Sequence, residues 1–305
     1  MTSPRRIGLV VNPTSGKGRG RVVGADTGAL LRSAGHEVLS LSGESAPEAL
    51  DRCTAAVASG IDTLVVVGGD GMVHLGANAV AGTGTALAVV ASGTGNDNAR
   101  SLGLPVLDAV AAAEIIDAGH RRRIDAARVV RAGQRDEWFV GVLCGGFDAV
   151  VNERANTWSW PRGRMRYNLA IARELPLFRP LPYELELDGV PWSTQAVLVA
   201  LGNGPSYGGG MQITPDASFD DGMLDVLVVG PLSVPRLIAV FPKVFSGKHT
   251  GHPAVTIKRA RRVRLSTPGV VAYADGERIG PMPLDVEVVP GALEVLVPAL
   301  PRAAL

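Results

Sequence analysis

Two glycine-rich turns constrain this sequence most, because each follows a short apolar run that is typical of a buried strand. Glycine lets backbone N–H groups approach a phosphate closely, and a helix that begins after such a turn adds positive dipole there. Each turn also carries an acid that would repel a nucleotide. We therefore expect Asp70 and Asp97 either to be paired structurally or to contact magnesium, a ribose or a hydroxyl that loses its proton. The turns comprise Gly68, Gly69, Asp70, Gly71 and Met72, then Gly93, Thr94, Gly95, Asn96 and Asp97.

Up to about residue 124, short apolar runs alternate with longer segments of helical character. This alternation predicts a parallel α/β sheet whose ligand lies at the carboxyl ends of the strands, where the glycine turns are. The expected strands are residues 7–11, 37–41, 63–67 and 86–90, and the expected helices are residues 21–34, 46–59, 72–81 and 107–118.

Beyond residue 124 the pattern changes to closely spaced β-like runs, which predict an antiparallel sandwich or barrel. We expect an α/β domain over 1–124, a β domain over 125–289 and a C-terminal segment, 290–305, that packs back on the first domain. Helical pieces are expected near 167–175 and 234–245. The β-like runs are 123–130, 137–142, 183–187, 195–201, 224–229, 254–259, 262–266, 270–275, 284–289 and 292–298.

Charge and cysteine usage limit the function classes. The 30 Lys and Arg against 29 Asp and Glu leave a net charge of +1, so there is no overall field for nucleic acid, and we expect no such partner. The two cysteines form no CxxC pair, which indicates a reducing compartment and no thiolate metal site. No apolar stretch reaches the roughly 18–20 residues that span a bilayer, and the sequence start lacks a signal-peptide core. We expect a soluble, cytoplasmic protein.

The turn after the first expected strand looks at first like a P-loop, but it fits neither the Walker nor the Rossmann spacing. Taken alone, it is as well explained by an ordinary turn as by a phosphate contact. Together with two further glycine turns at the same sheet edge, it favours a nucleotide cradle built from three loops, with Lys17 as a phosphate partner. Its residues are Asn12, Pro13, Thr14, Ser15, Gly16 and Lys17.

These three turns resemble the signature of the diacylglycerol kinase catalytic-domain family, whose superfamily includes sphingosine and ceramide kinases. The second half extends the resemblance to nearly the whole chain, in the pattern of soluble bacterial lipid kinases. The GGDG turn alone is weaker, because NAD kinases and some phosphofructokinases share it. The further segments are Gly202-Asn203-Gly204, Tyr207-Gly208-Gly209-Gly210, Asp220-Asp221-Gly222-Met223-Leu224-Asp225 and Asp275-Gly276-Glu277.

The resemblance implies an ATP-dependent kinase that phosphorylates a lipid hydroxyl, first of all that of diacylglycerol to give phosphatidic acid. ATP and Mg²⁺ would lie in a cleft between an ATP-binding α/β domain and a lipid-binding β-sandwich domain. Asp70 suits a magnesium contact or the role of base, and Glu277 resembles the family's proton acceptor; which of them is the base stays open. Asp275 is a third catalytic candidate, although Asp-Gly is also a strong hairpin-turn signal.

The resemblance also implies a second, structural magnesium site. Its ligands would be the side chain of Ser218, the carboxylate of Asp221 and the carbonyl of Met223, with waters completing the octahedron. A plain turn is the rival interpretation. His249 and His252 in a nearby polar loop are expected to be exposed rather than zinc ligands.

The sequence departs from the family pattern after the GGDG turn. Met72 stands where most members have Thr, His74 and Leu75 stand where they have Asn-Glu, and Asn98 replaces an aromatic residue. Three alternatives therefore stay open: a kinase of another lipid, a kinase of a soluble substrate such as NAD, and a non-catalytic nucleotide or lipid sensor. A homodimer is also left open.

A lipid kinase without a membrane span must touch the bilayer from outside. Residues 158–167 combine Trp158 and Trp160 with Arg162, Arg164 and Arg166, a composition suited to anionic headgroups. A loop packed on its own domain is the equal alternative. We expect peripheral association with the membrane.

Overall fold

The computed structural model describes residues 3–131, 133, 135–158, 160, 169–170, 173 and 179–299. Its contacts divide the chain into two compact units. Unit 1 comprises Met1–Ala126 and Val289–Leu305, and unit 2 comprises Ala127–Val288. Strands β5 (Arg121–Val130) and β16 (Leu284–Leu296) each continue from one unit into the other.

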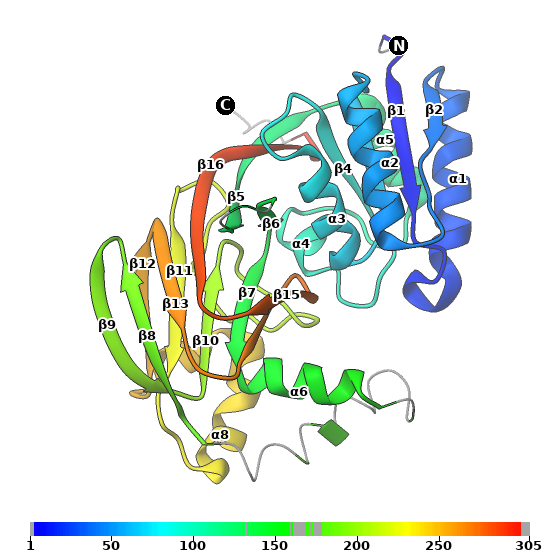
Figure 1. The fold of residues 1–305 in the computed structure, drawn as a ribbon. Coiled ribbons are helices and arrows are strands. Elements are labelled where there is room, and N and C mark those ends of the chain that lie inside the picture. Colours follow the sequence, from blue (N-terminus) through cyan, green and yellow to red (C-terminus); the bar gives the residue numbers. More distant parts are fainter. Residues whose placement is uncertain are drawn as a thin grey trace, which may run out of the picture. The chain divides into compact units, whose positions relative to one another are not determined.

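Unit 1 is built on a parallel sheet with the strand order β2-β1-β3-β4, which β16 extends by a parallel pairing of Val295 with Leu87 (Figure 1). Strands β3 and β4 are buried along their whole length, as expected where helices cover both faces of a sheet. The elements are β1 (Arg6–Val11), η1 (Ser15–Gly18), α1 (Arg19–Ser33), β2 (Glu37–Ser40), α2 (Ala46–Ala58), β3 (Thr63–Gly68), α3 (Asp70–Val80), β4 (Ala86–Ala91), α4 (Asp97–Ser101) and α5 (Ala109–Ala118).

Local signals set the helix ends in unit 1. Helix α2 begins after Ser45, whose hydroxyl accepts the N–H of Glu48 at 3.4 Å. Helix α5 begins after Asp108, whose carboxylate accepts the N–H of Ala111 at 2.9 Å, and it ends at Gly119 with φ +71°. Polar side chains that cap a first turn and a left-handed glycine after the last are the usual terminators of a helix.

Unit 2 contains a six-stranded sheet, β12-β11-β10-β7-β14-β15, whose neighbouring strands are all antiparallel. A second antiparallel layer has the order β16-β13-β8-β9. The elements are β6 (Glu137–Phe139), β7 (Val142–Gly146), α6 (Phe147–Asn156), β8 (Leu181–Leu187), β9 (Val190–Ala196), β10 (Leu198–Gly202), β11 (Leu224–Val229), α8 (Val234–Val240), η2 (Phe241–Ser246), η3 (Lys248–Gly251), β12 (Val255–Ala260), β13 (Arg262–Ser266), β14 (Val271–Ala274) and β15 (Glu277–Pro281).

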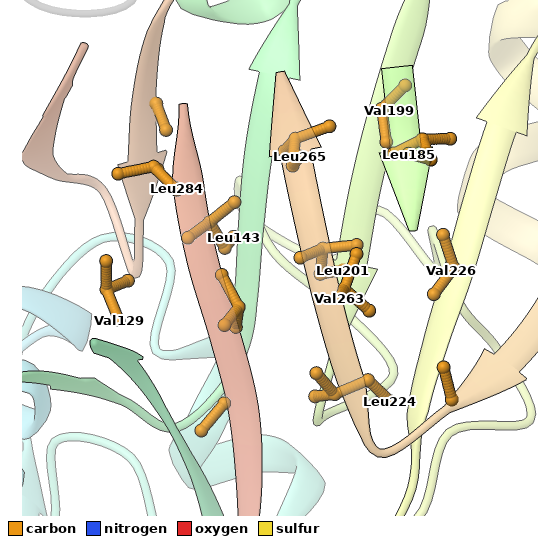
Figure 2. Close-up of a cluster of buried hydrophobic side chains, with 14 of the residues drawn as sticks. Val129, Leu143, Leu185, Val199, Leu201, Leu224, Val226, Val263, Leu265 and Leu284 are labelled. Atoms are coloured by element: carbon orange, nitrogen blue, oxygen red, sulfur yellow. The ribbon is translucent and has the colours of Figure 1, made fainter. Parts of the chain in front are cut away.

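The core of unit 2 lies between these two layers. Figure 2 shows side chains from the six-stranded sheet, such as Leu201 and Val226, beside those of the second layer, such as Leu265 and Leu284. The opposite face of the six-stranded sheet is buried as well, under α6 and the α8–η2 segment. Residues of β11 therefore contribute alternately to two cores, which explains why this strand is buried throughout.

The architecture confirms the expected parallel α/β part and the expected antiparallel β part. The sequence prediction was wrong in detail where a β-like run crosses a bend: residues 137–142 span the gap between β6 and β7. The two runs expected after residue 284 are one strand, β16. Helices α4 and α6 were not anticipated, and the helix expected near 167–175 falls largely outside the described residues. None of the described helices is long and apolar enough to cross a bilayer.

Candidate phosphate-binding and catalytic site

The first and third glycine turns of unit 1 meet at the carboxyl ends of β1 and β4. The hydroxyls of Ser15 and Ser92 lie 2.7 Å apart and share a hydrogen bond. Gly16 lies against the backbone of Ser92, since a Cβ at Gly16 would be 2.1 Å from the Ser92 carbonyl oxygen. With φ +56°, Gly16 also adopts the left-handed conformation that glycine accepts without strain.

The second and third turns are joined even more closely. The carbonyl of Gly68 accepts the N–H groups of Ser92 at 2.8 Å and Gly93 at 3.2 Å. A Cβ at Gly93 would lie 2.5 Å from the Cα of Gly69, a distance that no real side chain tolerates. The structure thus brings together the three loops that the sequence predicted to share one sheet edge.

Asn96 fixes the shape of the third loop. It adopts a left-handed conformation with φ +56°, and its side chain bonds both backbone groups of Gly93 at 2.9 Å. Asp97 follows as the first residue of α4 and is buried. The loop is therefore held by its own side chains.

Asp70 is the half-buried first residue of α3, next to these loops. One of its carboxylate oxygens accepts the N–H of Asn98 at 3.0 Å, a bond that ties the second turn to α4. A carboxylate at a helix N-terminus is stabilised by the helix dipole. Asp70 is thereby held in a defined orientation beside the glycine loops.

Lys17 is the exposed cation of the first loop, with φ +63°. Within the described parts of the chain its ammonium group has no recorded ion pair, so it is available to an anion. The loop itself is shaped by Asn12, whose side-chain oxygen accepts the N–H of Thr14 at 3.0 Å and its hydroxyl at 2.8 Å. Pro13 and Thr14 are exposed beside it.

In unit 2, Asp275 is buried and both of its carboxylate oxygens are used by the backbone. They accept the N–H groups of Val140 and Gly141, each at 2.8 Å. Asn203 completes this knot by donating its side-chain N–H to the carbonyl of Val140 at 2.7 Å. Asp275 therefore organises the chain around residues 140–141. Glu277, two residues later at the start of β15, is exposed and has no recorded side-chain partner among the described residues.

In the loop expected to hold a structural magnesium ion, the guanidinium of Arg259 lies against the acids. The carboxylate of Asp221 contacts the guanidinium of Arg259 and accepts the N–H of Met223 at 3.0 Å, while Ser218 donates its hydroxyl to Asp220 at 2.6 Å. Arg259 also donates to Asp225 at 3.1 Å. Both oxygens of Asp221 are thus engaged, and magnesium would have to displace the guanidinium. The residues fit the ion poorly, and magnesium at this loop stays a prediction that the geometry disfavours.

The positive charge of Arg259 helps to keep the buried carboxyl of Asp225 ionised. The side chain of Asp225 is only 4% exposed, and this burial raises the pKa of its carboxyl, an effect that Arg259 opposes. No cluster of three or more His, Cys, Asp or Glu residues suited to a metal occurs in the described portion of unit 2 or unit 1.

One further expectation needs correction. His249 is buried, not exposed: its Nε2 lies 3.0 Å from the carbonyl oxygen of Ile213, and burial lowers the pKa of its imidazole. Trp158 packs against Val151 and Ala170, whereas Trp160 is 78% exposed. The arginines 162, 164 and 166 lie outside the described residues.

Sequence reasoning assigned no positioning role to four residues that hold the others in place, namely Ser92, Asn98, Asn203 and Arg259. Ser92 and Asn203 stand inside the glycine motifs, so their spacing could have drawn attention to them. Asn98 acts through its backbone N–H, which no residue pattern identifies. Arg259 stands in a basic run, 258–264, and its pairing with Asp221 and Asp225 joins residues far apart in the sequence.

Glycine loops that meet at the carboxyl edge of a parallel sheet, with an acid at the following helix, define a nucleotide-phosphate-binding protein. Comparison with known proteins narrows this class. The family model "diacylglycerol kinase catalytic domain" matches residues 6–129, and the model "YegS C-terminal NAD kinase beta sandwich-like domain" matches residues 141–297.

A diacylglycerol kinase of Mycobacterium tuberculosis is 40% identical over 296 residues, which cover 96% of this chain and 95% of that protein. A diacylglycerol kinase of Staphylococcus saprophyticus is 27% identical over 92% of this chain and 91% of its own length. A crystal structure from Bacillus anthracis, described as a candidate diacylglycerol kinase, superposes with a TM-score of 0.78 at 25% identity and covers 98% of this chain and 99% of its own.

The chain belongs to the diacylglycerol kinase family. It is thus a lipid kinase, a phosphotransferase with an alcohol acceptor, and the family implies the use of ATP. The fold class and the lipid-kinase function expected from the sequence are confirmed. The individual site residues and an active site between the two units stay predictions.

Proposed function

We propose that this chain transfers the γ-phosphoryl group of ATP to the free hydroxyl of diacylglycerol and releases phosphatidic acid. The observation that carries the proposal is the convergence of three glycine loops, linked by Ser15, Ser92 and Gly93, around the held carboxylate of Asp70. The names of the full-length relatives support diacylglycerol as the acceptor.

The three loops would bind the nucleotide phosphates. Glycines 16, 69 and 93 let the loops approach one another within van der Waals contact, and a bound phosphate can then contact backbone rather than side chains. The exposed ammonium of Lys17 supplies positive charge at the first loop. Magnesium bound with the nucleotide would neutralise phosphate charge, and Asp70 is the carboxylate of this cluster suited to contact it.

We propose Glu277 as the general base that accepts the proton of the lipid hydroxyl. A general base must be accessible and unengaged, and Glu277 is exposed without a recorded partner in the described part of unit 2. Asp275 cannot share this role easily, because both of its oxygens accept backbone N–H groups. By fixing the turn that precedes Glu277, Asp275 acts as a positioning residue.

The test is transfer of radiolabel from [γ-³²P]ATP to a panel of lipid hydroxyls in mixed micelles, with NAD as the soluble control. We expect labelled phosphatidic acid from diacylglycerol and no labelled NADP. Preferred labelling of another lipid or of NAD would replace the proposed acceptor. Absence of label on every acceptor, with retained ATP binding, would indicate a sensor instead.

A further inference from the structure

Segment α8–η2 of unit 2 presents two apolar stripes at helical spacing, and only one of them is used by the fold. Leu237 and Val244 pack against the covered face of the six-stranded sheet, and Val240 is buried. Ile238, Phe241 and Phe245, each one position further along the chain, form a neighbouring stripe and are 57%, 45% and 48% exposed. We call these three residues the outer stripe.

The outer stripe is a continuous apolar surface rather than three scattered side chains. Residues three and four positions apart are neighbours on a helical surface, which places Phe241 between the other two. The rings of Phe241 and Phe245 are in edge-to-face contact, with centroids 6.1 Å apart. Exposed apolar patches of this kind mark interaction sites in soluble folds.

The segment that carries the outer stripe, residues 232–252, contains basic residues and no Asp or Glu. Arg236, Lys243 and Lys248 are exposed and have no recorded ion pair with a described residue. Along the chain no Asp or Glu occurs between Asp225 and Asp275. Large apolar side chains flanked only by cations are typical of segments that lie in the interface of an anionic bilayer.

We propose that the outer stripe, with Arg236, Lys243 and Lys248, docks unit 2 on the surface of an anionic lipid bilayer. Ile238, Phe241 and Phe245 insert among the headgroups, and the three cations contact lipid phosphates. A second copy of this chain fits the surface less well. A two-fold interface places each patch on itself, which would bring like charges together.

The inference rests on the proposed function in one respect: a kinase of diacylglycerol must reach a lipid that stays in the bilayer. It shifts the expected membrane contact, because Trp158 is engaged in packing against Val151 and Ala170. The helix α6 and the α8–η2 segment cover the same face of the six-stranded sheet, so this helical face, and not the opposite layer, is the membrane-facing one (Figure 1).

Binding to vesicles in the absence of ATP and diacylglycerol tests the docking surface without reference to catalysis. The triple variant Ile238→Ser, Phe241→Ser, Phe245→Ser should bind vesicles of phosphatidylcholine and phosphatidylglycerol at least ten-fold more weakly than the unmodified chain. The matched control is Val22→Ser, Val110→Ser, Val190→Ser, three apolar residues that are 61%, 56% and 66% exposed elsewhere. The control should bind normally, and thermal unfolding should show that both variants are folded.

The cations are tested separately. Replacing Arg236, Lys243 and Lys248 by Gln should weaken binding to these vesicles by about five-fold per charge, and high salt should reproduce the loss in the unmodified chain. Binding to vesicles of phosphatidylcholine alone should already be weak and should change little.

A fluorescent probe reports insertion directly. The native cysteines Cys53 and Cys144 are buried, and burial raises the pKa of the Cys53 thiol to about 11, so a thiol reagent would select an introduced cysteine. A polarity-sensitive fluorophore on Phe245→Cys should shift to the blue on vesicles, and the same label on Val190→Cys should not.

The proposal is overturned if the outer-stripe variant binds vesicles as well as its control. It is also overturned if the unmodified chain is a dimer that this variant dissociates without a loss of vesicle binding. Activity on a short-chain, water-soluble diacylglycerol distinguishes the two proposals. If the chain binds vesicles but shows no kinase activity, the proposed function is wrong and the docking surface remains. If the chain is active but the outer-stripe variant binds vesicles as well as its control, the docking surface is wrong and the proposed function remains.

Discussion

The glycine loops of unit 1 and the acidic turns of unit 2 position their functional groups in different ways. In unit 1 the backbones of two loops touch, as those of Gly69 and Gly93 do, and local side chains such as Asn96 fix the loop shape. In unit 2 side chains hold the backbone, as Asp275 holds Val140 and Gly141. We propose that Asp70 of unit 1 serves a ligand, whereas Asp221, Asp225 and Asp275 of unit 2 are engaged by the fold.

We propose different roles for two acids of similar sequence context. Asp70 and Asp275 both precede a glycine, but Asp70 begins a helix and accepts the N–H of Asn98, whereas Asp275 has both oxygens on the backbone N–H groups of Val140 and Gly141. Glu277 is the exception in unit 2, because it is exposed and unengaged within the described residues. The predictions below test this division.

The largest effect is expected from Glu277→Gln, which removes the proposed base. Turnover of a water-soluble diacylglycerol should fall by about 10²- to 10⁴-fold, the usual contribution of general-base catalysis. The melting temperature should not change, because no described contact is lost. Glu186→Gln, an exposed glutamate on β8, is the matched control. Near-normal kcat in Glu277→Gln would return the role of base to Asp70.

Gly93→Ala tests the backbone contact in unit 1. The added methyl group would lie 2.5 Å from the Cα of Gly69, so the loops must separate. We expect a loss of about 1–3 kcal/mol in the free energy of unfolding, as for other overpacked sites, together with weaker ATP binding by calorimetry. Gly84→Ala adds the same group where nothing lies within 4 Å and should be neutral. Equal behaviour of the two variants would contradict the cradle.

Arg259→Met tests the cation of the acidic loop. It leaves the buried carboxylate of Asp225 without its guanidinium, and we expect a loss of about 1–2 kcal/mol, discounted because Arg259 is half exposed. Arg264→Met, which removes a wider contact with Asp285 at 4.0 Å, should cost less stability.

Magnesium binding at the same loop is tested with Asp221→Ala. Without nucleotide, magnesium should raise the melting temperature of the unmodified chain no more than that of Asp221→Ala. A magnesium response that Asp221→Ala abolishes would instead establish the metal site expected from the family pattern.

His249 gives the smallest effect, a pH dependence of stability. Burial lowers the pKa of its imidazole in the folded protein below the unfolded value of about 6.5. Below that value the unfolded state binds more protons, so the free energy of unfolding falls as the pH is lowered through this window. His249→Gln should flatten the slope of chemical-denaturation stability between about pH 6.5 and pH 5. An unchanged slope would show that other groups carry it.

The sequence could predict the cradle of unit 1 because glycine spacing reports backbone geometry directly. The parallel strands β3 and β4 were recognisable for a related reason: burial on both faces requires an unbroken apolar run. For the acids of unit 2, the sequence pattern could not distinguish a ligand-binding role from a structural one. Whether Asp275 meets a ligand or a backbone N–H, and whether Asp221 meets magnesium or Arg259, depends on tertiary contacts between residues far apart in the chain.

Bends and short elements escaped prediction for a physical reason as well. The break between β6 and β7 falls at Val140–Gly141, where the buried carboxylate of Asp275 replaces sheet hydrogen bonds. Nothing in the local apolar pattern signals such a partner. Helix α4, with five residues, begins after the left-handed Asn96, and it depends on the loop rather than on a periodic pattern of its own.

The division between the two units is tested most directly by measuring kcat and the free energy of unfolding for Asp70→Asn and Asp275→Asn side by side. Asp70→Asn is nearly isosteric and keeps an oxygen for the N–H of Asn98, so stability should fall less than in Asp275→Asn, while kcat falls by about 10²-fold or more because the negative charge is lost. Asp275→Asn places an amide N–H opposite a backbone N–H and should cost about 1–3 kcal/mol of stability, with a smaller loss in kcat. A stable Asp275→Asn enzyme without turnover, beside a destabilised but active Asp70→Asn enzyme, would contradict the assignment of a ligand role to unit 1's acid and a structural role to Asp275.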